Sequence, residues 1–136
     1  MTVKNAHGGC PSKIVDYAIR VSEQISYDEC HVTFDTDIGE EEVKRAEMLA
    51  LEKNIRIYKS YNIENELLDI LTTSESKLNK KSPKTTKEAK EVLQKACCLK
   101  RMNDEIDWQR YFPKELLDQA RQNNRWLDDQ IEIFEN

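Results

Sequence analysis

Apolar side chains recur at helical spacing in three segments of the first half of the chain. One stripe follows Ser12, which predicts a helix over 12–25 with Ser12 as its N-cap. A second stripe predicts a helix over 40–54, and its first turn carries glutamates that suit the positive end of a helix dipole. A third stripe predicts a short helix over 63–71.

Two short strand-like runs separate these helices. Residues 31–34 alternate between polar and apolar side chains, and the run ends at Asp35. His31 opens this run and is expected to be a half-buried structural histidine. Residues 55–58 form the second run. Helices and strands therefore alternate along the chain, which is typical of an α/β protein with a small parallel sheet.

The composition changes after Leu71. Residues 72–87 consist almost wholly of Ser, Thr, Lys, Asn and Glu with one proline, which predicts a solvated linker. Apolar residues at helical spacing return in 88–136. We therefore expect an α/β core over 1–71, a polar basic linker over 72–87 and a helical C-terminal extension over 88–136.

The net charge of the chain limits the kinds of binding partner that can be expected. The chain has 136 residues and a formal net charge of −5, which argues against a protein whose whole surface binds nucleic acid. The linker nevertheless contains a local basic run, Lys77, Lys80, Lys81 and Lys84. These lysines are the candidate contacts to nucleic-acid phosphates, although such a run is usually only a solvated loop.

Sequence signals for membrane insertion and secretion, together with the cysteines, indicate the cellular compartment. No stretch approaches the roughly 20 apolar residues that a membrane span needs, and no signal peptide is visible at the N-terminus. We therefore expect a cytoplasmic protein whose four cysteines are free thiols. The spacing of cysteine and histidine residues does not match a structural zinc site.

Asp35 and Asp37 follow the first predicted strand. Alternation along a strand places residues i and i+2 on one face, so both carboxylates could approach one cation. Mg²⁺ prefers such oxygen ligands and keeps several waters, so two carboxylates can suffice. Gly39 would let the backbone turn tightly behind them, and Glu40 could act through water. The same residues could equally end the strand and cap the next helix, so both interpretations stay open.

The order of these pieces resembles the Toprim-like domain of the RloB-like abortive-infection proteins. The matching pieces are the glycine turn with its Pro-Ser helix start, the Phe-Asp-x-Asp strand end at 34–37, Ser60 near the end of the next strand, and the glutamate-bearing helix start at 63–68. The segment 111–124 and the closing Leu-Asp-x-x-Ile pattern resemble the tail of that family. The resemblance implies a small Toprim-like, Rossmann-like parallel-sheet core.

The resemblance also implies a chemistry. In Toprim domains an Asp-x-Asp pair binds Mg²⁺ for phosphodiester cleavage or joining, and a glutamate on an earlier strand acts as general acid/base. By resemblance, Asp35 and Asp37 would be the metal pair. Glu64 would lie at the end of the neighbouring strand as a catalytic or substrate-side group.

The chain departs from that pattern in one respect. In the family the key glutamate precedes the glycine turn, whereas the first acidic residue here is Asp16, inside the first predicted helix. Three explanations follow: a degenerate domain that binds but does not cut, a domain completed by a partner, or another carboxylate, Glu40 or Glu64, in the missing role.

These observations lead to two functional hypotheses. We expect a degenerate Toprim/RloB-like protein of a defence or anti-defence system that acts mainly by binding a protein or nucleic-acid partner. The alternative is a Mg²⁺-dependent Toprim-type nuclease that uses Asp35 and Asp37. A sheet without its first strand exposes an edge, so we also expect a homo-oligomer or a partner protein that covers the edge.

Overall fold

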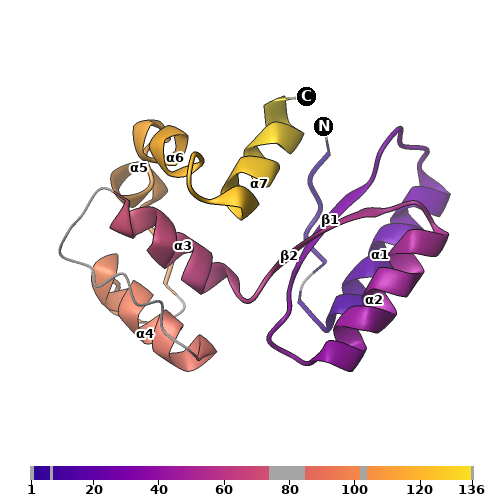
Figure 1. The fold of residues 1–136 in the computed structure, drawn as a ribbon, viewed down its shortest axis with the longest axis horizontal. Coiled ribbons are helices and arrows are strands. Elements are labelled where there is room, and N and C mark those ends of the chain that lie inside the picture. The colour runs from indigo at the N-terminus through magenta and orange to yellow at the C-terminus, as the bar shows by residue number, and fades with distance from the viewer. Residues whose placement is uncertain (1, 7, 74–84, 102–103, 136) are drawn as a thin grey trace. The chain divides into compact units, whose positions relative to one another are not determined.

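A computed structural model describes residues 2–6, 8–73, 85–101 and 104–135. The described residues form seven helices and a two-stranded parallel sheet, so the protein is a mixed α/β protein with a helical C-terminal part. The chain divides into two compact units, Met1–Tyr61 and Asn62–Asn136. Figure 1 shows the elements of each unit.

The N-terminal unit is built from two helix–strand pairs. Its elements are α1 (Pro11–Gln24), β1 (His31–Asp35), α2 (Glu40–Glu52) and β2 (Arg56–Ser60). The two strands are parallel, with His31 paired to Arg56. The predicted parallel arrangement is therefore confirmed.

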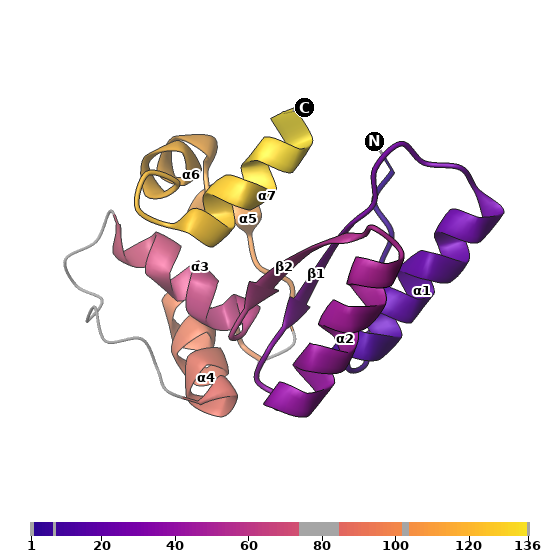
Figure 2. The ribbon, with the colours of Figure 1, turned by 45° about the vertical axis from the view of Figure 1, so that its right-hand side comes forward.

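Both helices of the N-terminal unit pack on the same face of the sheet (Figure 2). Val32 and Phe34 of β1 are buried there, whereas the intervening Thr33 is exposed. They join a core with Val15 of α1 and with Ala46 and Ala50 of α2. Small alanine side chains let α2 lie close to the strands. The helices α1 and α2 therefore form a single layer over that face of the sheet.

The start of α1 differs from the prediction. The N-cap is Cys10, and Pro11 occupies the first helical turn, so the prediction that Ser12 caps the helix is wrong. The physical reason is that proline suits the first helical position, where its missing N–H costs no hydrogen bond.

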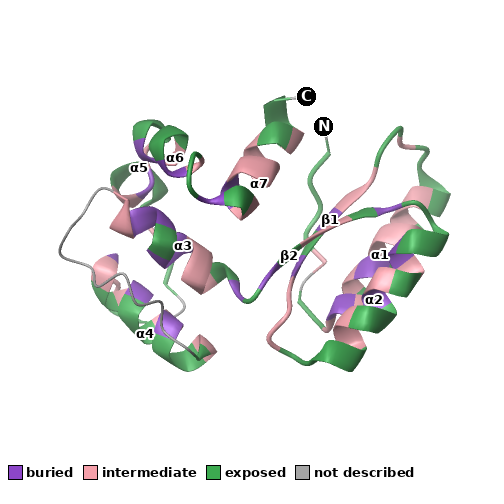
Figure 3. Ribbon diagram, viewed as in Figure 1, coloured by how far each residue is buried: buried purple, intermediate pink, exposed green. Residues whose placement is uncertain are grey.

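The C-terminal unit is wholly helical in its described part. Its helices are α3 (Ile63–Thr72), α4 (Thr86–Ala96), α5 (Trp108–Tyr111), α6 (Lys114–Ala120) and α7 (Arg125–Glu135). Its buried apolar residues come from α3, α4, α6 and α7 and from the helix ends at Cys97 and Phe112 (Figure 3). They form a single core that consists of Leu67, Leu68, Ile70, Leu71, Ala89, Leu93, Cys97, Phe112, Leu116, Ala120 and Leu127.

Along the sequence, the boundary between the two compact units lies ten residues before the predicted domain boundary. The predicted core extended to Leu71, but α3 packs against α4 and α6 within the C-terminal unit. Four buried apolar residues on α3 explain this assignment, because they complete the helical core.

Two further expectations can be compared with the structure. All four cysteines are free thiols, as predicted. Among the described residues, no helix is both long enough and apolar enough to span a bilayer.

Candidate functional site

The two candidate metal-binding aspartates lie at the carboxyl end of β1. Asp35 is the last residue of the strand and pairs with Ser60 of β2. Asp37 lies in the turn between β1 and α2. Because the strand ends at Asp35, its alternation does not extend to Asp37, and the inference that the strand itself aligns the two carboxylates is wrong.

Gly39 shapes the backbone after this turn. It is the N-cap of α2 and has φ +129°, a conformation that side-chain-bearing residues rarely adopt. A Cβ at this position would meet no atom within 4 Å, so the requirement for glycine comes from the backbone conformation alone. Gly39 therefore permits the tight turn that the sequence predicted.

The fit of Mg²⁺ to this end of the sheet is limited. Within the part of the chain that the structure describes, no group of three or more His, Cys, Asp or Glu side chains could hold a metal ion. Asp35 and Asp37 each take part in an interaction within the protein. Mg²⁺ is often held by one or two carboxylates together with waters and phosphates. Two carboxylates alone do not form a complete protein cage for the ion, which would need further oxygen ligands.

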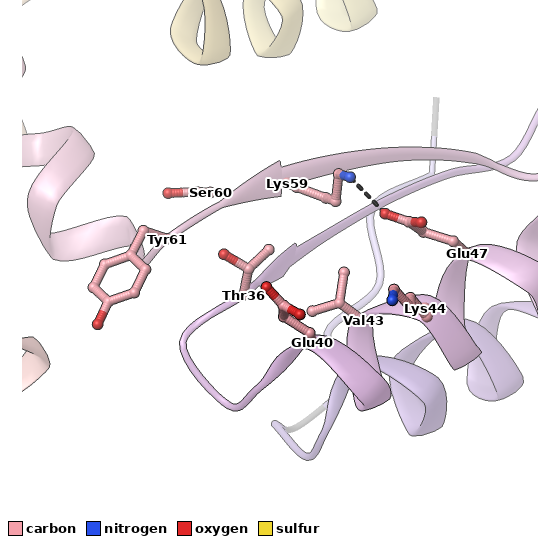
Figure 4. A pocket seen from close by; sticks show the side chains of 8 residues that line it. All are labelled: Thr36, Glu40, Val43, Lys44, Glu47, Lys59, Ser60 and Tyr61. Atoms are coloured by element: carbon pink, nitrogen blue, oxygen red, sulfur yellow. Dashed lines mark hydrogen bonds and ion pairs between the residues drawn. The ribbon is translucent and has the colours of Figure 1, made fainter.

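A depression of about 700 Å³ lies beside the same end of the sheet (Figure 4). Its lining combines two lysines, two glutamates and three hydroxyl groups: Lys44, Lys59, Glu40, Glu47, Thr36, Ser60 and Tyr61. Lys59 Nζ lies 2.5 Å from Glu47 Oε1, and the backbone N–H of Thr36 donates to the carbonyl of Ser60 at 2.7 Å. This balance of charges suits a polar ligand without a strong net charge.

A carboxylate occupies the start of α1. Glu42 of α2 accepts hydrogen bonds from the hydroxyl of Ser12 and, at 2.9 Å, from its backbone N–H. The Glu42 side chain is only 17% exposed. Hydrogen bonds from the Ser12 hydroxyl, the Cys10 thiol and the Ser12 backbone lower the pKa of Glu42 to about 2. The glycine turn therefore leads to a helix start that already holds an anionic group from the protein itself.

The remaining predicted site residues lie elsewhere in the chain. Glu64 is in the first turn of α3, which belongs to the C-terminal unit, so it does not share a unit with Asp35 and Asp37. The lysines predicted to contact phosphates lie outside the described residues: Lys77, Lys80, Lys81 and Lys84.

One polar cluster was not predicted from the sequence. His31 opens β1 and its side chain is 19% exposed, which agrees with the expectation of a half-buried histidine. It hydrogen-bonds Tyr58 of β2 on one side and Glu29 on the other. The register of the two strands brings His31 and Tyr58 together, and the sequence gives no direct sign of that register.

Comparisons with known proteins give no relative for this chain. No family model matches it, and no curated protein or solved structure is significantly similar to it. The resemblance to RloB-like Toprim domains therefore stays a prediction from the sequence.

Proposed function

We propose that this chain is a degenerate Toprim/RloB-like protein of a defence or anti-defence system, and that it acts by binding a partner along the edge of its sheet. The observation that carries the proposal is the two-stranded sheet. Within the described residues β2 pairs with β1 alone, so its outer edge has no neighbouring strand. Strand edges of this kind pair readily with a further strand.

The hydrogen-bond pattern identifies which backbone groups form that edge. The N–H of Arg56 donates to Cys30, and the N–H of Thr36 donates to Ser60. In a parallel ladder alternate residues bond to the neighbouring strand, so the even-numbered residues of β2 face β1. The backbone groups of Ile57 and Lys59 therefore face the outer edge.

A second copy of the chain is the partner that can be tested first. We expect the wild-type protein to have twice the 16.0 kDa monomer mass in size-exclusion chromatography with light scattering. Lys59→Pro should give the monomer, because proline removes an outward N–H that β1 does not use. Lys59→Ala is the matched control, since it also loses the contact to Glu47 but keeps the N–H.

Three outcomes would contradict this proposal. They are a monomeric wild-type protein at micromolar concentration, a dimeric Lys59→Pro variant, and a monomeric Lys59→Ala variant. Far-ultraviolet circular dichroism of each variant confirms that the fold is retained.

The position of Asp35 favours a second candidate, a Mg²⁺-dependent nuclease. In open α/β sheets, ligands bind beyond the carboxyl ends of the strands, and Asp35 lies at such an end. Calorimetric titration with Mn²⁺, followed by a nuclease assay in the same buffer, compares wild type with Asp35→Asn/Asp37→Asn. Micromolar binding and cleavage that both disappear in the variant would support the nuclease. Absence of both in the wild type would exclude it.

A further inference from the structure

A chain of hydrogen bonds crosses the two strands on the face that α1 and α2 leave uncovered within the N-terminal unit. The hydroxyl of Tyr58 lies 3.1 Å from Nδ1 of His31, and Nε2 of His31 lies 3.1 Å from Oε2 of Glu29. The rings of His31 and Tyr58 are stacked, with their centroids 5.7 Å apart. Both ring nitrogens of His31 are therefore hydrogen-bonded, and the ring of Tyr58 stacks on the imidazole.

For a neutral imidazole, the chemistry of the three groups sets the direction of both hydrogen bonds. An ionised Glu29 carboxylate only accepts, so Nε2 of His31 carries the hydrogen on that side. In the neutral imidazole the other nitrogen, Nδ1, is then an acceptor, and the hydroxyl of Tyr58 donates to it. A phenol, an imidazole and a carboxylate thus stand in the order of a nucleophile, its general base and the group that orients the base.

A cationic side chain lies beside this chain of bonds. Arg56 is two residues before Tyr58 on β2 and therefore on the same face of the sheet. Its guanidinium is 3.8 Å from Oε1 of Glu29, and the side chain is 66% exposed. Arg56 is exposed and lies two residues from Tyr58 along β2. Its guanidinium can therefore bind the charged oxygens of a phosphate group near the Tyr58 hydroxyl.

We propose that Tyr58, His31, Glu29 and Arg56 form a nucleophilic site for anionic phosphodiesters. The Tyr58 oxygen attacks phosphorus, the bond from phosphorus to the leaving oxygen breaks, and the phenol proton passes to Nδ1 of His31. His31 then returns that proton to the leaving oxygen. In a second step water attacks phosphorus of the tyrosyl phosphodiester while His31 takes a proton from it. The bond from phosphorus to the Tyr58 oxygen breaks, and His31 returns the proton to that oxygen, which restores the phenol.

This site is independent of the proposed partner binding and of the aspartate pair. Tyr58 and His31 are the catalytic residues, Arg56 binds the substrate anion, and Glu29 is a positioning residue. Neither Asp35 nor Asp37 takes part in the hydrogen bonds that define the site.

The test uses the full chain and bis(p-nitrophenyl) phosphate in the presence of EDTA. We expect a burst of about one equivalent of nitrophenolate and an adduct on Tyr58, located by mass spectrometry of peptides. Tyr58→Phe should abolish both. His31→Gln should slow the burst about a hundredfold, the lower end of what a general base contributes. Tyr17→Phe is the matched control, because Tyr17 lies on α1 and takes no part in the hydrogen bonds that define the site.

The variants of the supporting residues separate their roles. Arg56→Ala should raise the half-saturating concentration of the phosphodiester while the adduct stays on Tyr58. Glu29→Gln should slow the burst, and Glu29→Asp should recover part of that loss, which a merely structural carboxylate would not explain. The reaction is measured in EDTA and needs no divalent cation, so failure of this site is distinguishable from failure of the nuclease hypothesis.

Several results would overturn the proposal. They are the absence of any adduct, equal labelling of Tyr58 and Tyr17, and a His31→Gln variant that reacts at the wild-type rate. Circular dichroism of each variant shows whether a lost reaction reflects a lost fold. If Tyr58→Phe or His31→Gln is unfolded, the labelling ratio of Tyr58 to Tyr17 in the wild-type protein decides the matter alone.

Discussion

The carboxylate of Glu42 connects two helices that are distant in the sequence. It accepts hydrogen bonds from Ser12 at the start of α1, and these bonds lower its pKa from 4.5 to about 2. The folded state therefore binds the proton less tightly than the unfolded state does. The contribution of this group to stability is complete above about pH 4.5 and is lost as the pH falls toward 2.

Replacement of Glu42 tests this interaction directly. We expect Glu42→Gln to be less stable than wild type at pH 7, and the difference in unfolding free energy should fall to roughly half or less at pH 3. Urea unfolding at the two pH values measures it. Glu41→Gln is the control, because Glu41 is exposed on the same turn and should change the stability little at either pH. A difference that does not depend on pH would contradict the assignment.

Single residues of the candidate site could be predicted from the sequence only where local rules decide their position. The position of Asp35 at a strand end and the need for glycine at Gly39 follow from alternation and turn chemistry. The bond between Glu42 and Ser12 could not be predicted, because it joins side chains of two helices whose packing is set by the core. The contact of His31 with Tyr58 likewise depends on the strand register.

At the scale of elements, the side chains of β1 alternate between buried and exposed positions. Val32 and Phe34 are 6% and 3% exposed, whereas Thr33 between them is exposed. The helices α1 and α2 cover one face only, and this makes the strand one-sided. The unit has few large core residues, so each of them contributes a large share of its stability.

Truncation of Phe34 should therefore be severe. Phe34→Ala is expected to cost about 3–5 kcal/mol, through lost apolar contact and a cavity between β1 and the two helices. Thr33→Ala on the neighbouring position should cost no more than about 1 kcal/mol. Hydrogen exchange of the β1 and β2 amides under native conditions measures both changes. Equal effects of the two substitutions would show that β1 is not one-sided.

The boundaries of the elements show where local reasoning stops. Predicted helices over 12–25 and 40–54 agree with α1 and α2 to within two residues. The second strand was predicted over 55–58, but it runs to Ser60. Its last residues are polar and have no strand-like pattern, and they are extended because they pair with Phe34 and Asp35.

For the whole molecule, the division at Tyr61 and Asn62 changes the meaning of α3. The predicted third helix was assigned to the α/β core over 1–71, yet α3 supplies Ile70 and three other buried residues to the helical core. The amphipathic pattern predicted the helix correctly. It could not predict which of two cores its apolar face would join, because either core satisfies the pattern.

The division predicts that the two units respond separately to mutation. Both tryptophans, Trp108 and Trp126, lie in the C-terminal unit, so their fluorescence reports on that unit. Ile70→Ala should lower the urea midpoint of tryptophan fluorescence, at a cost of about 2–5 kcal/mol. Hydrogen exchange of the β1 amides should stay close to wild type. Loss of protection in β1 to the same extent would show that the two units unfold as one.

The parallel pairing of β1 and β2 has a consequence for folding kinetics. Each residue of β1 meets its partner only after the chain has passed through the whole of α2, since His31 pairs with Arg56 and Asp35 with Ser60. No tight turn joins the strands, so the first contact already closes the same long loop as the last one. We expect the rate of sheet formation to follow the stability of α2, the element that shortens this loop before the strands meet.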